Sequence, residues 1–338
     1  MRRHIICVLT LLTVLGLVLS AACAAPTPPK ESMPPSPQPT KEKPVEETKP
    51  EPEELPVFPL TIADDLGRTV LIEKLPQRII SLAPSNTEII YALGLEDKLV
   101  GTTDYCDYPE AAKAKTRVAS YTTPDMEKLI RLQPDLVIAE AIHEKTVLPA
   151  LEKLGLTVIV MSATSIDVVL RDITLIGQIN GKTKASAQLV TNLSQRIEAV
   201  TSKTEGLTPK ERPKVLYVVW HNPIWTMGCN TFIDDLIYKA GGSNIFADDF
   251  EKSRVVSLEA VIAKNPQVII VSGMATTSDL IYNSIIREQR LQVVDAIINN
   301  RVHKISDANL IERPGPRIVD GLDEVARLIH PEIFITHK

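Results

Sequence analysis

The chain has 338 residues, a formal net charge of −5 and an aromatic content of 4%. Its length favours two lobes over one compact domain, and the mildly negative charge without a basic block argues against nucleic-acid binding. Because aromatic residues are scarce, the places where they gather should be informative.

Residues 1–23 have the order of a secretory signal: a basic start, an apolar run from Ile5 to Leu19, and small residues that end at Cys23. The run is short for a membrane span. The segment resembles a bacterial lipoprotein signal, in which such a cysteine is acylated, although Ser20 stands where an aliphatic residue is usual. Cleavage after Ala24, which would discard Cys23, is the alternative. We expect an exported protein that Cys23 anchors to the outer face of the cytoplasmic membrane.

Residues 24–56 are rich in proline, lysine and glutamate. Such a composition cannot bury a core, and it predicts an extended, disordered tether between the membrane and the folded part.

Two cysteines, Cys106 and Cys229, belong to the folded part and fall in separate halves. Export would permit a disulfide between them. We favour two unpaired, partly sheltered thiols, because the two positions are far apart in the sequence, and we do not expect a metal pair.

From residue 60 onward, short β-branched runs alternate with helical patterns, which is typical of α/β layering. The first half, residues 60–181, predicts strands at 78–83, 99–103, 135–139 and 157–161 and helices at 87–95, 126–132, 144–154 and 166–179. At the first strand-to-helix corner, Ser85 and Glu88 have the spacing of a capping box.

Residues 182–203 contain no glycine or proline and carry apolar residues at helical spacing. One helix over 182–205 would span about 30 Å. The second half, 213–338, predicts strands at 214–219, 268–272 and 302–305 and helices at 231–240, 258–264, 279–288 and 316–329. We therefore expect two Rossmann-like α/β lobes joined by one long backbone helix, with a cleft between the lobes that opens and closes little.

In open α/β sheets, ligands bind beyond the carboxyl ends of the strands. The loops predicted there carry both tryptophans and three of the seven tyrosines, namely Trp220, Trp225, Tyr105, Tyr108 and Tyr121. Rings that converge on a cleft suit a large, flat ligand. The alternative is that each ring packs beneath its own loop.

Four stretches carry a family resemblance: RIISLAPSNTEIIYALGLEDKLVGTTDYCDYPEAA, AGGSNIF, VSLEAVIAKNPQVIIVSG and ERPGPRIVDGLDEVARLIHPE. They resemble the helical-backbone solute-binding proteins of vitamin B12 and ferric-siderophore ABC importers, above all the cobalamin-binding branch. The resemblance covers essentially everything after the tether. It implies a non-enzymatic, monomeric receptor that holds cobalamin or another corrinoid in the cleft.

The resemblance also implies which residues contact this ligand. Those implied to line the corrin face are Pro84, Tyr105, Tyr121 and Trp220 or Trp225; those implied to bond the amides at its edge are Arg313 with Asp307 or Asn309. One departure concerns Lys252-Ser253-Arg254, which stand where cobalamin binders have a tryptophan. One stacking contact is therefore missing or replaced.

Delivery of the ligand implies a permease dimer with its ATPase subunits as partner. By resemblance, Glu144 and Glu259 are the surface glutamates that dock onto arginines of the permease. The alternative for both is an acidic residue that complements a helix dipole.

Three other functions stay open. The same scaffold could bind a ferric siderophore, for which Arg313 and Arg254 are candidates, or haem, with His143, His221 or Tyr121 as axial ligand. A metal-ion receptor would need clustered histidines, and the chain shows no His-rich loop or short metal spacing. A tetrapyrrole chelatase is the enzymatic alternative, but nucleophile-elbow, P-loop and dinucleotide motifs are missing, so we predict no catalytic residue.

Overall fold

The computed structural model describes residues 56–273 and 277–334. The signal segment 1–23 with Cys23, and the tether up to residue 55, lie outside the described residues. Among the residues that are described, none of the helices combines the length and the hydrophobicity needed to cross a membrane.

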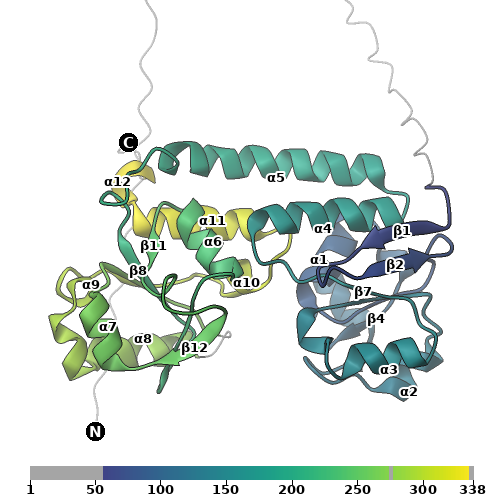
Figure 1. Ribbon diagram of the computed structural model, residues 1–338, viewed down its shortest axis with the longest axis horizontal. Helices are drawn as coiled ribbons and strands as arrows, with labels where there is room; N and C mark the ends of the chain where they lie inside the picture. Colours follow the sequence, from purple (N-terminus) through teal and green to yellow (C-terminus); the bar gives the residue numbers. More distant parts are fainter. Residues whose placement is uncertain (1–55, 274–276, 335–338) are drawn as a thin grey trace, which may run out of the picture. The chain divides into compact units, whose positions relative to one another are not determined.

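The first half folds around a five-stranded parallel sheet with the order β5-β4-β3-β6-β7 (Figure 1). Its strands are β3 Ile79–Ser81, β4 Leu99–Thr103, β5 Thr116–Ala119, β6 Leu136–Ala139 and β7 Val158–Val160. Its helices are α1 Pro84–Ala92, α2 Met126–Arg131, α3 Val147–Lys153 and α4 Ile166–Ile179, with short 3-10 turns η1 Glu96–Lys98, η2 Glu110–Ala114 and η3 Ala141–His143.

Both faces of this sheet are covered, as is usual for parallel sheets. Along β6, Leu136 and Ile138 pack with side chains of α1 and α4, whereas Val137 and Ala139 pack with side chains of α2 and α3. This period of two explains why the strands read as continuous apolar runs in the sequence.

The second half folds around a four-stranded parallel sheet with the order β11-β8-β13-β14. Its strands are β8 Lys214–Val218, β11 Ser243–Asn244, β13 Val268–Val271 and β14 Val302–Lys304. Its helices are α6 Phe232–Lys239, α7 Leu258–Lys264, α8 Ser278–Arg287, η4 Gln289–Val293, α9 Asp295–Ile298, α10 Asn309–Glu312, α11 Ile318–Ile329 and α12 Pro331–Phe334. We call the elements around the two sheets the N-terminal and C-terminal lobes.

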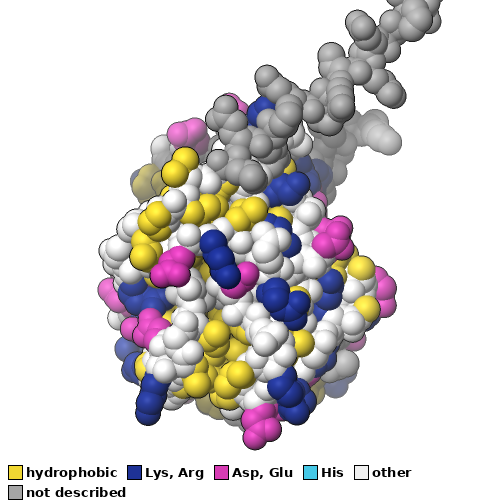
Figure 2. Space-filling model, turned by 90° about the vertical axis from the view of Figure 1, so that its right-hand side faces the viewer, with side chains coloured by type: hydrophobic (Ala, Val, Ile, Leu, Met, Phe, Trp, Pro, Cys, Tyr) yellow, Lys and Arg dark blue, Asp and Glu magenta, His cyan; other side chains and the backbone are white. Residues whose placement is uncertain are grey.

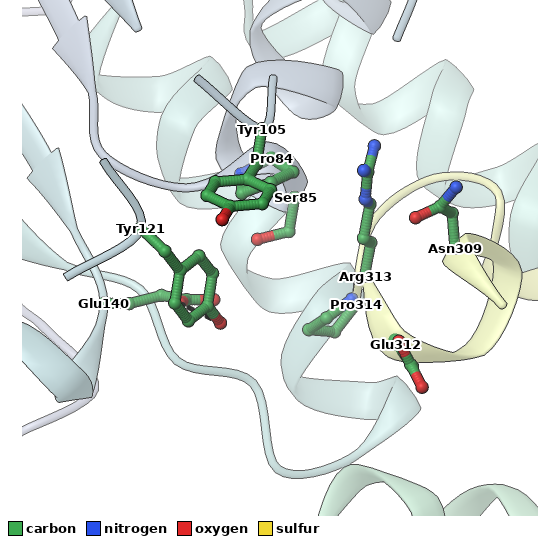
Figure 3. Close-up of a pocket in the computed structure, with 9 residues that line it drawn as sticks. All are labelled: Pro84, Ser85, Tyr105, Tyr121, Glu140, Asn309, Glu312, Arg313 and Pro314. Atoms are coloured by element: carbon green, nitrogen blue, oxygen red, sulfur yellow. Dashed lines mark hydrogen bonds between the residues drawn. The ribbon is translucent and has the colours of Figure 1, made fainter. Parts of the chain in front are cut away.

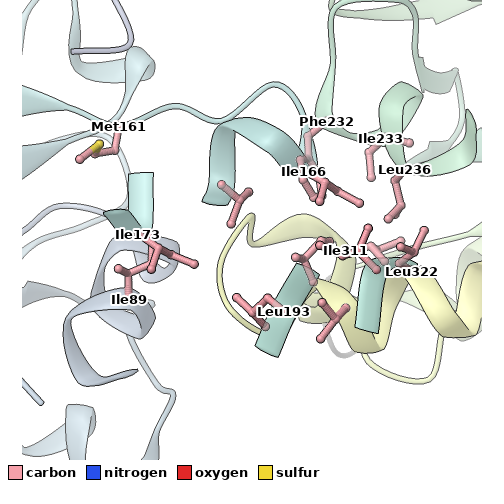
Figure 4. Packing of buried hydrophobic residues seen from close by; sticks show 14 of the residues in the cluster. Ile89, Met161, Ile166, Ile173, Leu193, Phe232, Ile233, Leu236, Ile311 and Leu322 are labelled. Atoms are coloured by element: carbon pink, nitrogen blue, oxygen red, sulfur yellow. The ribbon is translucent and has the colours of Figure 1, made fainter. Parts of the chain in front are cut away.

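Helix α5, Thr183–Thr204, runs between the lobes and packs on α4, α6 and α11 (Figure 1). Its Leu193 belongs to a cluster of buried apolar side chains that also contains Ile173 of α4 and Leu236 of α6 (Figure 4). The lobes therefore share part of one core beneath α5. The expected mixed α/β fold is confirmed, and α5 begins and ends within one residue of the predicted helix. The limits of the two lobes stay predictions, because the described residues belong to one compact unit.

Two antiparallel additions were not predicted. One is the hairpin of β1 Leu60–Ala63 and β2 Thr69–Ile72; the other is the sheet β12-β10-β9, built from β9 Trp220–His221, β10 Ile224–Met227 and β12 Ser253–Val256. The latter pairs Trp225 with Trp220. The departing segment Lys252-Ser253-Arg254 enters this sheet through β12, where Arg254 lies 5.0 Å from the ring centre of Phe250.

The predicted capping box is wrong. Ala83 is the N-cap residue of α1, Pro84 follows at the first turn, and no side chain caps the helix. The Glu88 carboxylate instead accepts two hydrogen bonds from Arg317, at 2.8 and 2.7 Å. A local sequence pattern was thus overridden by a contact with a residue far along the chain.

The expectation of two unpaired thiols is confirmed: Cys106 is buried, Cys229 is half-buried, and both are free. The Cys106 sulfur lies 3.1 Å from the Thr87 hydroxyl and 3.2 Å from that of Thr103, so it is a sheltered part of the first strand-to-helix corner.

Candidate ligand-binding cleft

Four side chains of the N-terminal lobe come together because each follows the carboxyl end of a strand in the same parallel sheet. Pro84 follows β3, Tyr105 follows β4, Tyr121 follows β5 and Glu140 follows β6. Pro84 suits the start of α1, since its fixed φ is compatible with the first helical turn and its missing N–H is not needed there.

These side chains form one wall of a cavity of about 230 Å³, which we call the narrow pocket (Figure 3). The opposite wall comes from the C-terminal lobe and consists of Asn309, Glu312, Arg313 and Pro314. The Tyr105 and Tyr121 rings meet edge to face, with centres 5.8 Å apart. Both lobes thus contribute to one ring-lined space.

A second cavity of about 740 Å³, the wide pocket, extends into the C-terminal lobe. Its wall is largely apolar and comes from β8 to β10, α6 and α10; it includes Tyr217, Val219, Trp220, Trp225, Met227, Phe232, Ile233 and Ile311. It shares Glu140, Glu312 and Pro314 with the narrow pocket, so the two cavities adjoin. We refer to both together as the cleft.

Seven of the eight residues expected at the ligand line this cleft. Pro84, Tyr105, Tyr121, Asn309 and Arg313 border the narrow pocket, and Trp220 and Trp225 border the wide one. Asp307 borders neither and lies 3.5 Å from Arg317. The four rings are 37–47% exposed, so they are not packed away beneath their own loops. Their role in binding stays a prediction.

Beside the cleft, charged groups form a network between the lobes. Arg313 lies 2.5 Å from Asp107 and 3.8 Å from Glu88. Arg317 forms an ion pair with Glu88, and its guanidinium lies 3.9 Å from the ring centre of Tyr108. Partial burial acts to raise the pKa of Asp107, but the bond and charge of Arg313 bring it below its usual value. Arg313, the residue expected to bond the ligand, is therefore already paired.

Two carboxyl groups at the cleft, Glu140 and Glu312, were not among the residues expected at the ligand. The Tyr121 hydroxyl lies 3.4 Å from the Glu140 carboxylate, and burial raises the pKa of Glu140 to about 7 although this contact lowers it. Burial, followed by the charge of Glu140, also raises the pKa of Tyr121. Glu312 accepts hydrogen bonds from the hydroxyls of Tyr217, at 3.2 Å, and Ser272.

Of the three axial-ligand candidates for haem, Tyr121 is the one that borders the narrow pocket. His143 is buried, its Nδ1 accepts the backbone N–H of Glu140 at 3.1 Å, and desolvation lowers its pKa. His221 borders a separate groove beside α7 and α8. Among the described residues, no three His, Cys, Asp or Glu side chains are grouped so that they could hold a metal ion.

The two glutamates expected at the permease differ in their surroundings. Glu259 lies in the first turn of α7, its side chain is 72% exposed, and it lies 3.5 Å from Arg290. Glu144 is exposed but precedes the start of α3 at Val147, so a helix-dipole role does not account for it. Helices α3 and α7 lie on the side away from α5 (Figure 1). Docking stays a prediction for both residues.

Figure 2 shows how charged side chains are distributed on one face of the N-terminal lobe. Basic and acidic side chains are interspersed on this face, without a block of one sign (Figure 2). It therefore offers no continuous basic track for a nucleic acid.

The chain is similar to known binding proteins of transport systems. The family model described as periplasmic binding protein matches residues 79–308. A Bacillus subtilis (strain 168) protein named uncharacterized ABC transporter substrate-binding lipoprotein YvrC is 33% identical over 283 residues, which cover 82% of this chain and 88% of the relative.

Two solved structures are similar over most of this chain. The periplasmic vitamin B12 binding protein BtuF of Vibrio cholerae is 29% identical with a TM-score of 0.67, covering 78% of this chain and 99% of that one. The periplasmic heme-binding protein RhuT from Roseiflexus sp. RS-1, in apo form, is 25% identical with a TM-score of 0.66, covering 75% and 98%.

Proposed function

The chain belongs to the periplasmic binding protein family and is a substrate-binding protein of an ABC importer; on this premise we propose that its substrate is a corrinoid such as cobalamin, bound in the cleft. The family consists of solute-binding transport proteins and not of enzymes. The chain therefore works with a permease, its ATPase subunits and a small-molecule ligand.

One observation carries the proposal: rings from both lobes border two adjoining cavities, one narrow and one wide and apolar. A scavenging receptor needs roughly nanomolar affinity, about 12 kcal/mol. Tyrosine and tryptophan supply large contact areas at low entropic cost, so a broad, flat macrocycle can obtain this affinity from such walls. The similarity to the vitamin B12 binding protein of Vibrio cholerae supports the same ligand class.

Haem is the second candidate. Tyr121 borders the narrow pocket, and a tyrosine oxygen is one of the groups that hold haem iron in proteins. The Roseiflexus neighbour is named as a heme-binding protein. A ferric siderophore is less well supported, since an anionic chelate calls for several converging arginines; Arg313 borders the narrow pocket, but Arg254 borders neither cavity.

Anchoring, docking and lobe movement complete the proposed role. Cys23 carries the lipid, Glu144 and Glu259 contact the permease, and lobes 60–181 and 213–338 close on the ligand about the helix 182–205. Replacing Cys23 by serine should move the protein from the membrane fraction to the soluble fraction after cell lysis. Equal membrane retention of both forms would contradict the anchor.

Calorimetric titration of the mature chain with cyanocobalamin, cobinamide and haem tests the ligand. We expect a corrinoid to bind with one-to-one stoichiometry. Trp225→Ala and Tyr121→Ala should each weaken corrinoid binding by roughly ten- to a hundredfold, because each removes a cleft ring. Tyr238→Ala is the matched control, since this exposed tyrosine of α6 does not border the cleft. A corrinoid that stays free in solution would refute the proposal.

A further inference from the structure

Two carboxyl groups from opposite lobes, Glu140 and Glu312, border both the narrow and the wide pocket. Glu140 directly follows β6, and Glu312 is the last residue of α10. Because both belong to the boundary that the two cavities share, a ligand that fills the cleft must meet both of them.

The groups that contact these carboxyls are uncharged donors. Glu140 meets the Tyr121 hydroxyl at 3.4 Å and the backbone N–H of His143. Glu312 accepts from the hydroxyls of Tyr217 and Ser272. Neutral donors do not cancel the charge of a carboxylate, so its preference for a further N–H donor or a cation remains.

The arginine that borders the narrow pocket, Arg313, does not balance the pair. Its guanidinium lies 2.5 Å from Asp107 and 3.8 Å from Glu88, neither of which borders the cleft. The Arg313 guanidinium is thus directed toward Asp107 and Glu88 and away from the two cleft carboxyls (Figure 3).

We propose that Glu140 and Glu312 are specificity-determining residues, which accept N–H donors from the edge of the ligand and disfavour tetrapyrroles that carry free carboxylates. The inference rests on the proposed function in that it assumes a tetrapyrrole in the cleft. A corrinoid presents primary amides, which can donate to both residues. Porphyrins such as haem present two propionates, which meet like charge in a desolvated site, and such repulsion is a common source of specificity.

Because of Glu140 and Glu312, the affinities for corrinoids and for porphyrins should depend on pH in opposite directions. Burial raises the pKa of Glu140 to about 7. The other titratable or charged groups around it are Tyr121, His143 and Glu312, together with Arg313, whose guanidinium is directed away from it. Amide donors favour ionised Glu140, so corrinoid affinity should rise with pH up to about 7 and then level off. Propionates favour the protonated form, so porphyrin affinity should be level below about 7 and fall above it.

The test compares cyanocobalamin with metal-free protoporphyrin IX, which cannot gain affinity by iron ligation to Tyr121. Dissociation constants are measured at pH 6 and pH 8 for the mature chain and for Glu140→Gln, Glu312→Gln and the control Glu127→Gln, an exposed residue of α2. Either cleft variant should bind protoporphyrin about tenfold more tightly at pH 8, and Glu140→Gln should lose the pH dependence. The control should behave as the unchanged chain.

The outcomes separate the two proposals. If a corrinoid binds but both cleft variants keep the original ligand preference and pH profile, the inference fails while the proposed function stands. If no corrinoid binds, the proposed function fails. In that case, tighter porphyrin binding by the variants would still support the role of Glu140 and Glu312 in specificity, and unchanged porphyrin binding would overturn that role. Should Glu140→Gln not fold, Glu312→Gln and the pH profile of the unchanged chain decide.

Discussion

At the scale of single residues, Asp172 has the most unusual carboxyl environment outside the cleft. It is 2% exposed, and Arg171 contacts both Asp172 and the neighbouring Asp65. Burial, followed by the charge of Asp65, raises the pKa of Asp172 to about 8. The folded chain therefore keeps a proton that the unfolded chain releases near pH 4.

This difference sets the sign of a pH effect on stability. Between about pH 4 and 8 the native state binds more protons than the unfolded state, so the free energy of unfolding falls as the pH rises and levels off above about 8. Asp172→Asn should remove this slope and raise the melting temperature at pH 8. Melting curves at pH 5, 6.5 and 8 test it, with the exposed Asp167→Asn of the same helix as control; an unchanged slope would contradict the assignment.

Residues of the cleft could be predicted where their place after a strand is enough to bring them there. Tyr105 follows the predicted strand 99–103, and the rule about carboxyl ends of strands places it at the cleft. Tyr121 was also expected there and borders the cleft, although β5, the strand before it, was not predicted. Residues 140–143 follow the predicted strand 135–139, so the same rule applies to them, but the sequence does not tell which of their side chains faces the ligand. In the structure Glu140 borders the cleft, whereas His143 turns into the fold and bonds to backbone.

At the scale of elements, the contact between α4 and α5 depends on a small residue. A methyl group added to Gly177 would overlap the side chain of Ser186 in α5. Gly177→Ala should therefore lower the free energy of unfolding by roughly 1–3 kcal/mol, because overpacking forces one helix outward. Urea denaturation measures the change.

Gly206→Ala is the matched control, since no atom lies within 4 Å of a methyl group added there. It should leave the free energy of unfolding nearly unchanged. Equal losses for both variants would show that the close approach of α4 and α5 is not what makes Gly177 necessary.

The ends of the long helices were predicted most accurately. Helix α4 begins and ends where its apolar spacing indicates, and α5 does so within one residue. Strands β9 to β12 have two to four residues each and were missed. Their pairing is decided by partners that are distant in the sequence. Strands β3 and β7 are as short, but they lie in buried runs that the sequence makes visible.

At the scale of the whole molecule, the Glu88–Arg317 pair ties the lobes together beside the shared core. The side chains of Glu88 and Arg317 are 2% and 16% exposed, and two hydrogen bonds join them. Glu88→Gln should lower the free energy of unfolding by about 2 kcal/mol, because a charged, sheltered bond is weakened.

A double variant with Arg317→Gln should lose less than the sum of the two single losses, since both act on the same contact. The exposed pair Arg196–Asp320 between α5 and α11 supplies the control: Asp320→Asn should cost less than about 1 kcal/mol. Chemical denaturation of the four variants measures both effects. Strict additivity of Glu88→Gln and Arg317→Gln would contradict a direct coupling across the lobes.

The α/β alternation, the long helix between the halves and the loops that carry the rings can be predicted from the sequence, because these features follow from spacing among near neighbours. Only the folded structure shows that the Glu88 carboxylate bonds to Arg317, 229 positions away, and does not cap its own helix. The folded structure also shows that Arg313 is paired with Asp107 and that Glu140 and Glu312 border the same cleft. Such partners depend on how the two lobes pack together under α5, and no local pattern records that arrangement.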